Sequence, residues 1–256
     1  MNPDAEAEQF VRAHTRLSTT PLLPELPLHL SDDVVDLWER MTDRAAALGT
    51  TVELPYWASS WPGGQAVARY VLDHPDLVVG KRVLDVASGS GLIGIAAARA
   101  GAAHVQVNDI DKLCEASALV NAAANGVTVE PLTDDILDAT TDADVVVVGD
   151  AFYAKGLADR MLPFVRRAAR AGALVLVGDP GRAYLPQPRT DWRRVATYRI
   201  PVTDLEQGEV KVTGVWRLRA RSLPLRAEQQ RDAYQPRRAR AAGRSVAGRG
   251  RANRKP

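Results

Sequence analysis

From Lys81 onward the chain alternates short apolar segments with helical patterns, and this alternation limits the possible folds more than any other feature. Valines fill most of segment 144–148, as is typical of a parallel strand buried on both faces. The expected strands are 82–86, 104–109, 127–131, 144–148 and 173–177, and the expected helices are 92–100, 112–124 and 156–170. Alternation at this spacing predicts a parallel sheet with helices on both faces.

Segments 194–200 and 210–218 also have strand character, but no long helix lies between them. Two successive strands joined by a loop suit an antiparallel pair that closes the sheet. The sequence therefore predicts an α/β fold with a mostly parallel sheet and an antiparallel C-terminal strand pair.

The region before the alternation has a weaker pattern. Prolines 21, 24 and 27 indicate an irregular arm over the first thirty residues. Ser31 is a candidate N-cap for a helix whose apolar positions run from Val34 to Leu48, and Gly49 is expected to end it. A further helix is expected over 65–72. We divide the chain into an N-terminal arm and helix (1–50), a main domain (51–218) and a tail (219–256).

Composition excludes several classes of protein. The single cysteine, Cys114, excludes a disulfide framework, and the four histidines have no metal-ligand spacing, so no metal site is expected. The acidic, polar start lacks the pattern of a signal peptide, and no apolar run reaches the ~18 residues of a membrane span. A cytoplasmic location without membrane association is expected.

The net charge of +2 hides a strong polarity along the chain. Residues 219–256 contain eleven Arg and one Lys against two acids, which gives +10 and leaves −8 for residues 1–218. This tail has too few large apolar residues to offset the entropy of ordering, so it is expected to be disordered. It can hold nucleic acid electrostatically or have no specific role, and both interpretations fit its composition.

A glycine-rich turn joins the first expected strand to its helix. Gly89, Gly91 and Gly94 form G-x-G-x-x-G, which by itself fits a nicotinamide dinucleotide as well as other nucleotide-type ligands. Asp85 ends the strand, and a carboxylate there opposes a pyrophosphate but suits a ligand with a sulfonium and an ammonium group. Asp109 ends the next strand, where a carboxylate can accept both ribose hydroxyls of either class.

Five motifs follow one another along the chain: WPGGQA at 61–66, VLDVASGSG at 83–91, NDID at 108–111, GDAFY at 149–153 and GDPGR at 178–182. The resemblance that they carry extends over residues 17–218. The chain resembles the electron transfer flavoprotein β-subunit lysine methyltransferases, which are class I methyltransferases and whose bacterial relatives are often described as nicotinamide N-methyltransferase-like. It departs from the family pattern at Ala87, where glycine is common and where one methyl group narrows the cofactor cleft slightly.

The resemblance implies a Rossmann-like seven-stranded sheet and S-adenosyl-L-methionine as the methyl donor. It places Trp61 beside the cofactor, Asp135 at the adenine amine and Ile136 against the adenine face. As alternatives, Trp61 is a core tryptophan and Asp135 belongs to an ordinary turn. The implied cofactor-binding residues are Trp61, Gly63, Asp85, Gly89, Gly91, Asp109, Asp135, Ile136 and Gly149.

Asp150 and Tyr153 match the acid-x-x-aromatic pattern of the lysine-modifying group and are the candidate catalytic residues. A lysine ammonium, with a pKa of ~10.4, must lose a proton before it attacks, and aromatic walls lower its pKa by desolvation. Asp150 is expected to orient the amine, and Tyr153 to stack on the aliphatic stem or accept a hydrogen bond. Alternatively, the segment is a charged loop that caps the helix near Gly156.

The tetrad Asn-Pro-Pro-Tyr, expected of enzymes that methylate base amino groups or glutamine amides, is absent. The favoured function is a methyltransferase acting on lysine in a protein substrate, either an electron transfer flavoprotein β-subunit-like protein or a ribosomal protein. The alternatives are a small-molecule amine methyltransferase, a nucleic-acid-binding module that uses the tail, and a dehydrogenase. A monomer is expected.

Overall fold

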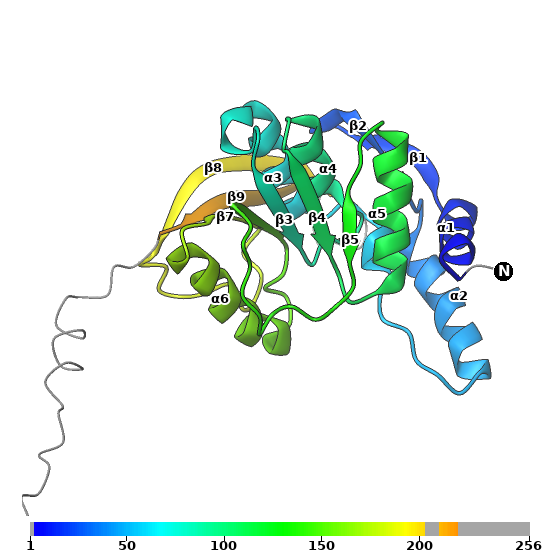
Figure 1. Cartoon of the computed structure of the whole chain (residues 1–256). Coiled ribbons are helices and arrows are strands. Elements are labelled where there is room, and N and C mark those ends of the chain that lie inside the picture. The colour runs from blue at the N-terminus through cyan, green and yellow to red at the C-terminus, as the bar shows by residue number, and fades with distance from the viewer. Residues whose placement is uncertain (1–2, 203–209, 220–256) are drawn as a thin grey trace, which may run out of the picture. The chain divides into compact units, whose positions relative to one another are not determined.

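The computed structural model describes residues 3–202 and 210–219, which contain a seven-stranded sheet in the order β5-β4-β3-β6-β7-β9-β8 (Figure 1). The first five strands in this order are parallel, and β9 is antiparallel to both β7 and β8. The mostly parallel seven-stranded sheet and its antiparallel C-terminal pair are thus confirmed. The strands are β3 (Arg82–Val86), β4 (His104–Asn108), β5 (Glu130–Leu132), β6 (Val145–Gly149), β7 (Leu174–Asp179), β8 (Trp192–Pro201) and β9 (Val210–Leu218).

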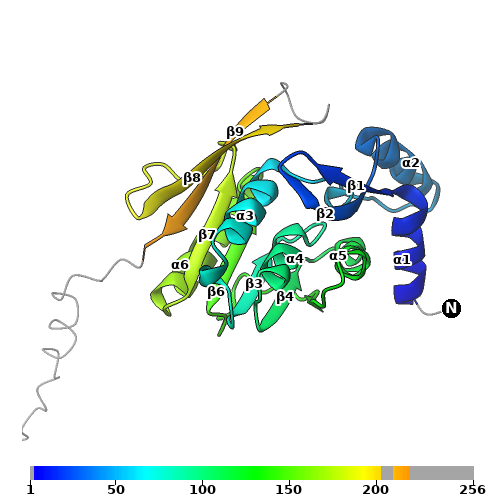
Figure 2. The same ribbon diagram turned by 90° about the horizontal axis from the view of Figure 1, so that it is seen from above.

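Helices cover both faces of the sheet, as the alternation predicted (Figure 2). The helices α3 (Pro62–Asp73), α4 (Leu92–Arg99) and α5 (Lys112–Ala124) share one apolar core, and α6 (Lys155–Arg170) belongs to the other. Strand β6 contributes to both apolar cores, since Val145 and Val147 face the first core while Val146 and Val148 face the second. This alternation explains why the central strands have no polar face.

Residues 3–30 form regular secondary structure rather than an irregular arm, so that prediction was wrong. They form α1 (Pro3–His14) and a hairpin of β1 (Arg16–Thr20) and β2 (Leu23–Leu30), followed by α2 (Val34–Ala47). Side chains of α5 and of its C-cap satisfy the backbone of β2: Asn121 accepts from the His29 N–H at 2.6 Å, and the C-cap Asn125 donates to the Pro27 carbonyl at 2.7 Å. Prolines are tolerated in this short ribbon because the hairpin uses few of its backbone donors.

Smaller differences from the sequence predictions concern element ends. The N-cap of α2 is Asp33, whose carboxylate accepts from the Asp36 N–H at 2.9 Å, and not Ser31. Helix α3 begins at Pro62, three residues before the predicted start, and short 3-10 turns lie at Tyr56–Ala58 and Pro75–Leu77. Apart from Arg219, the tail 219–256 lies outside the described residues.

The start of α3 lies directly against the ends of β6 and β7. A Cβ atom on Gly178 would overlap the carbonyl oxygen of Gly63, and a Cβ on Gly63 would overlap the Gly178 carbonyl. A Cβ on Gly149 would lie 2.8 Å from the Cα of Gly64. Glycine is therefore required on both sides of this contact, which explains the pairing of the WPGG and GDPGR motifs.

We expect Gly178→Ala to lower the free energy of unfolding by about 3 kcal/mol, because the added methyl meets backbone that cannot rotate away. The matched control is Gly156→Ala in α6, where a Cβ meets no atom within 4 Å. That control should leave stability unchanged or raise it by up to about 1 kcal/mol, since alanine favours helix. Urea denaturation of both variants measures the difference, and equal stabilities would contradict the close contact.

Candidate functional site

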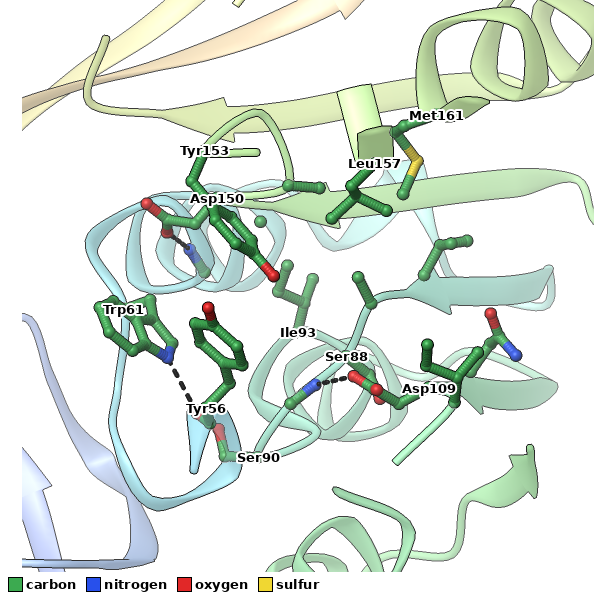
Figure 3. A pocket seen from close by; sticks show the side chains of 18 of the residues that line it. Tyr56, Trp61, Ser88, Ser90, Ile93, Asp109, Asp150, Tyr153, Leu157 and Met161 are labelled. Atoms are coloured by element: carbon green, nitrogen blue, oxygen red, sulfur yellow. Dashed lines mark hydrogen bonds between the residues drawn. The ribbon is translucent and has the colours of Figure 1, made fainter. Parts of the chain in front are cut away.

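A cavity of about 410 Å³ opens at the carboxyl ends of β3, β4 and β6 (Figure 3). This edge is where open α/β sheets bind ligands, and the volume is in the range of small-molecule pockets. Trp61, Tyr56 and Tyr153 lie at one end of the cavity and Asp109 at the other (Figure 3). Apolar side chains from the start of α6 and the segment after β5 complete the wall, namely Leu137, Leu157 and Met161.

The turn between β3 and α4 forms one wall of the cavity. Its Gly89 N–H donates to the Asp109 carboxylate at 3.1 Å, and its Ser88 N–H donates to the Asn108 carbonyl at 3.0 Å, so the turn is fixed to the end of β4. Ala87 adopts a φ of 54°, a left-handed conformation that disfavours any side chain. The glycine common at this position in the resembling family avoids that strain.

Asp85 lies behind the turn and does not line the cavity. The alternation of β3 directs its side chain to the α4 face, where it is fully buried and accepts from the Gly94 N–H at 2.8 Å. Its second oxygen has no partner within the described residues. Burial raises the pKa of Asp85 to about 7, with the nearby Asp109 charge adding to the effect. The prediction that Asp85 faces the ligand is therefore replaced by one in which it anchors the turn.

The raised pKa makes the stability of the fold depend on pH. Between the ordinary carboxyl value of 3.8 and about 7, the folded chain holds a proton on Asp85 that the unfolded chain releases. Stability therefore falls as pH rises through this window. We expect Asp85→Asn to gain stability relative to the wild type from pH 4 to pH 7, with no further gain above. Urea titrations at unit pH steps test this, and a pH-independent difference would contradict the buried proton.

Asp150 joins three parts of the structure at the end of β6. One carboxylate oxygen accepts from the Gly63 N–H and, at 3.2 Å, from the Gly64 N–H at the start of α3. The other accepts from Arg182 Nε at 2.9 Å and Nη2 at 2.6 Å. The residue is buried with a left-handed φ of 56°, and burial raises its pKa to about 6 despite the guanidinium of Arg182. Because both oxygens already accept two hydrogen bonds, Asp150 has little capacity left for an incoming amine.

Arg182 is a site residue that the sequence analysis did not single out. The Asp179 carboxylate accepts from the backbone N–H of Gly181 at 2.6 Å and of Arg182 at 2.7 Å, which fixes the segment after β7. The guanidinium of Arg182 then lies over the Trp61 ring, 5.8 Å from its centroid. The GDPGR motif at 178–182 contains this arginine, but the motif alone did not indicate which partner the arginine would meet.

Three aromatic rings form the end of the cavity that lies opposite Asp109. Trp61 Nε1 donates to the Tyr56 carbonyl at 2.8 Å, and the Tyr56 and Tyr153 ring centroids are 5.2 Å apart (Figure 3). Burial, followed by the hydrogen bond to Tyr56, raises the pKa of Tyr153. Its hydroxyl therefore stays protonated near neutral pH, and it can exchange hydrogen bonds but does not act as a base.

Asp135 lines the cavity with its carboxylate held by a cation. Arg160 reaches it through Nη1 at 2.7 Å and Nη2 at 2.9 Å, and this arginine lowers the pKa of Asp135. Ile136 turns to the α6 core, and its neighbour Leu137 lines the cavity instead. The residue expected against the adenine face thus lies one position from the one that reaches the cavity.

The structure brings most of the predicted site residues to one cavity. Those that line it are Trp61, Gly89, Asp109, Asp135, Gly149, Asp150 and Tyr153, and those that do not are Gly63, Asp85, Gly91 and Ile136. Gly63 and Gly91 have packing roles: the first contacts Gly178, and a Cβ on the second would lie 2.8 Å from the Ala118 side chain. Lining residues that the sequence did not indicate include Tyr56, Ser88, Ser90, Leu137, Leu157, Arg160, Met161 and Arg182.

The described residues offer neither a metal centre nor a membrane-spanning helix. They contain no group of three or more His, Cys, Asp or Glu side chains that could hold a metal ion. None of their helices is long and apolar enough to cross a membrane.

We expect Asp150→Ala to lower the free energy of unfolding by about 3–5 kcal/mol, because it leaves the Arg182 charge half-buried without its carboxylate. Arg182→Met should also be destabilising. The double variant should be less destabilised than the sum of the single variants, since it removes both members of the pair. A denaturant-based double-mutant cycle measures this coupling, and strict additivity would contradict it.

Comparisons with known proteins relate the chain to methyltransferases. The family model described as ribosomal protein L11 methyltransferase (PrmA) matches residues 70–171. The electron transfer flavoprotein beta subunit lysine methyltransferase of Xenopus laevis is 39% identical over 68% of this chain and 70% of its own length. That of Rattus norvegicus is 34% identical over 83% of this chain and 84% of its own length. A crystal structure of ribosomal protein L11 methylase from Lactobacillus delbrueckii subsp. bulgaricus is 22% identical and aligns with a TM-score of 0.43, covering 60% of this chain and 77% of that one.

Proposed function

The chain belongs to the family of electron transfer flavoprotein β-subunit lysine methyltransferases and is a methyltransferase, and from this premise we propose that it methylates lysine in a protein substrate with S-adenosyl-L-methionine as donor. One observation carries the proposal: a single cavity has a carboxylate at one end, Asp109, and a three-ring aromatic slot at the other. The end with Asp109 suits a nucleoside, and the aromatic end suits an alkyl amine. Family membership also sets aside the dehydrogenase and the simple binding module.

The residues of the cavity fit the proposed methyl donor. Asp109 lies at the end of β4, where a carboxylate can accept the two ribose hydroxyls, and the Gly89 turn allows close approach. Leu137, Leu157 and Met161 offer apolar surface suited to adenine. When bound, the sulfonium compound supplies an electrophilic methyl group. The chain itself needs to hold donor and amine in line.

The aromatic slot, which is the end of the cavity formed by three aromatic rings, favours the deprotonated form of the lysine side chain. Tyr56, Trp61 and Tyr153 remove water from an entering ammonium without adding charge, which lowers its pKa. The protonated Tyr153 hydroxyl can accept a hydrogen bond from the amine and hold its lone pair in one direction. We assign Asp150 a positioning role, since it fixes Arg182 and the start of α3 next to Trp61. The released proton leaves to water.

The substrate is proposed from the relatives. A protein similar to the electron transfer flavoprotein β-subunit is the first candidate, because the relatives that align over most of the chain are named for it. A ribosomal protein is the second, because the ribosomal protein L11 methyltransferase model matches residues 70–171. A monomer in the cytoplasm, with nucleic acid engaged only through the basic tail, remains part of this proposal.

The test is transfer from labelled S-adenosyl-L-methionine to the electron transfer flavoprotein β-subunit of the source organism, with the modified residue found by mass spectrometry. We expect methylated lysine. Asp109→Ala should weaken cofactor binding at least about tenfold, since it loses charge-assisted hydrogen bonds of ~1.5–3 kcal/mol, and should recover turnover at high cofactor concentration. Methylation of free small amines in place of any protein would overturn the substrate class. Tight binding of a nicotinamide dinucleotide with no affinity for the sulfonium compound would overturn the cofactor.

A further inference from the structure

A second cavity of about 550 Å³ lies beside the first and shares one wall with it. It is bounded by the β1–β2 hairpin, the start of α2, the segment 58–62 and the end of β8. Trp61 lines both cavities, so an occupant of the second would lie next to the aromatic slot. The second cavity is therefore adjacent, through Trp61, to the proposed site of methyl transfer.

The wall of this cavity holds polar atoms that the protein leaves without partners. Thr20 Oγ1, Ser60 Oγ and Gln65 Oε1 are all buried, and none of them has a hydrogen-bond partner among the described residues. Gln65 is only 4% exposed, and its amide nitrogen donates to the Ser60 carbonyl at 2.7 Å, which fixes the direction of the oxygen. Buried polar atoms are normally paired, so three together at one cavity indicate a site for hydrogen-bond donors.

The charges around the cavity favour a basic or amide-rich occupant. Asp32 and Asp33 line it, and no lysine or arginine does. Arg16 pairs with Asp32 from outside the lining, and Asp33 uses one oxygen to cap α2. A polypeptide segment meets these requirements, because its backbone presents N–H donors at regular spacing and its side chains can carry positive charge.

We propose that this second cavity binds the segment of the protein substrate that flanks the target lysine, with a basic side chain or backbone amides donating to Thr20, Ser60 and Gln65. The inference rests on the proposed function, since it presumes a protein that presents lysine to the aromatic slot. Trp61 then separates the flanking segment from the cofactor. The cavity would select substrates by the sequence around the modified lysine.

The test is the double variant Thr20→Val/Ser60→Ala, because neither hydroxyl has a partner in residues 3–202 and 210–219 and its removal breaks no hydrogen bond there. We expect the melting temperature and the affinity for S-adenosylhomocysteine to be unchanged. The KM for the electron transfer flavoprotein β-subunit should rise about tenfold, as two lost hydrogen bonds require, with kcat within about twofold. Steady-state kinetics with the full-length enzyme measure both constants.

Thr213→Val is the matched control, since Thr213 Oγ1 is also buried and has no partner in the part of the chain that the structure describes, but it lies in β9 and lines neither cavity. It should leave KM unchanged. Thr19→Arg gives a second route: this exposed position lines the cavity, and an added positive charge should raise KM without loss of stability.

The outcomes separate the two proposals. A wild-type enzyme that methylates no protein lysine overturns the proposed function, and the inference with it. If the wild type is active, an unchanged KM in both the double variant and Thr19→Arg means that the cavity holds only water, and this overturns the inference alone. An equal rise in KM for Thr213→Val would also overturn it.

Discussion

The contact between the start of α3 and the ends of β6 and β7 is the constraint on which the site depends. Here backbone packs on backbone, because side chains at Gly63 or Gly178 would overlap the opposite chain. Asp150 closes the contact by accepting from the first amides of α3, as an N-cap does, but from a distant strand. The position of Trp61, at the N-cap of α3, follows from this arrangement.

Buried carboxylates at the ends of strands hold the segments that form the cavity. Asp85 holds the turn that begins α4, Asp150 holds α3 and Arg182, and Asp179 holds the segment after β7. For each of the three, burial is the first cause of a raised pKa. Asp150 also lines the cavity, but both of its oxygens are already paired, whereas Asp85 and Asp179 do not line it. The more exposed Asp109 and Asp135 present charge to the cavity.

The sequence predicted the sheet well because period and apolar content are local properties. The valines of β6 and the strand-like run of β9 are recognisable in isolation. The sequence prediction was wrong where groups distant in the chain determine the structure. Strand β2 depends on Asn121 of α5 and on the C-cap Asn125, and the early start of α3 depends on Asp150.

The same reason explains the errors within the site. The acid-x-x-aromatic motif predicted that Asp150 and Tyr153 belong to the site, and both line the cavity. Only the fold reveals that one oxygen of Asp150 already accepts hydrogen bonds from Arg182. Likewise, a stretch such as Asp135-Ile136-Leu137 does not indicate which apolar side chain faces the ligand.

The firm attachment of Trp61 has a consequence for the order of binding. Its indole is tied to the Tyr56 carbonyl on one side and covered by Arg182, which is itself held by Asp150. Linkage between two sites requires an element whose position both ligands change, and it is reciprocal where it exists. Because Trp61 is held in place, binding in one cavity is expected to have little effect on the affinity of the other. If the donor binds in the first cavity and the flanking segment in the second, as proposed, their two affinities are expected to be nearly independent of each other.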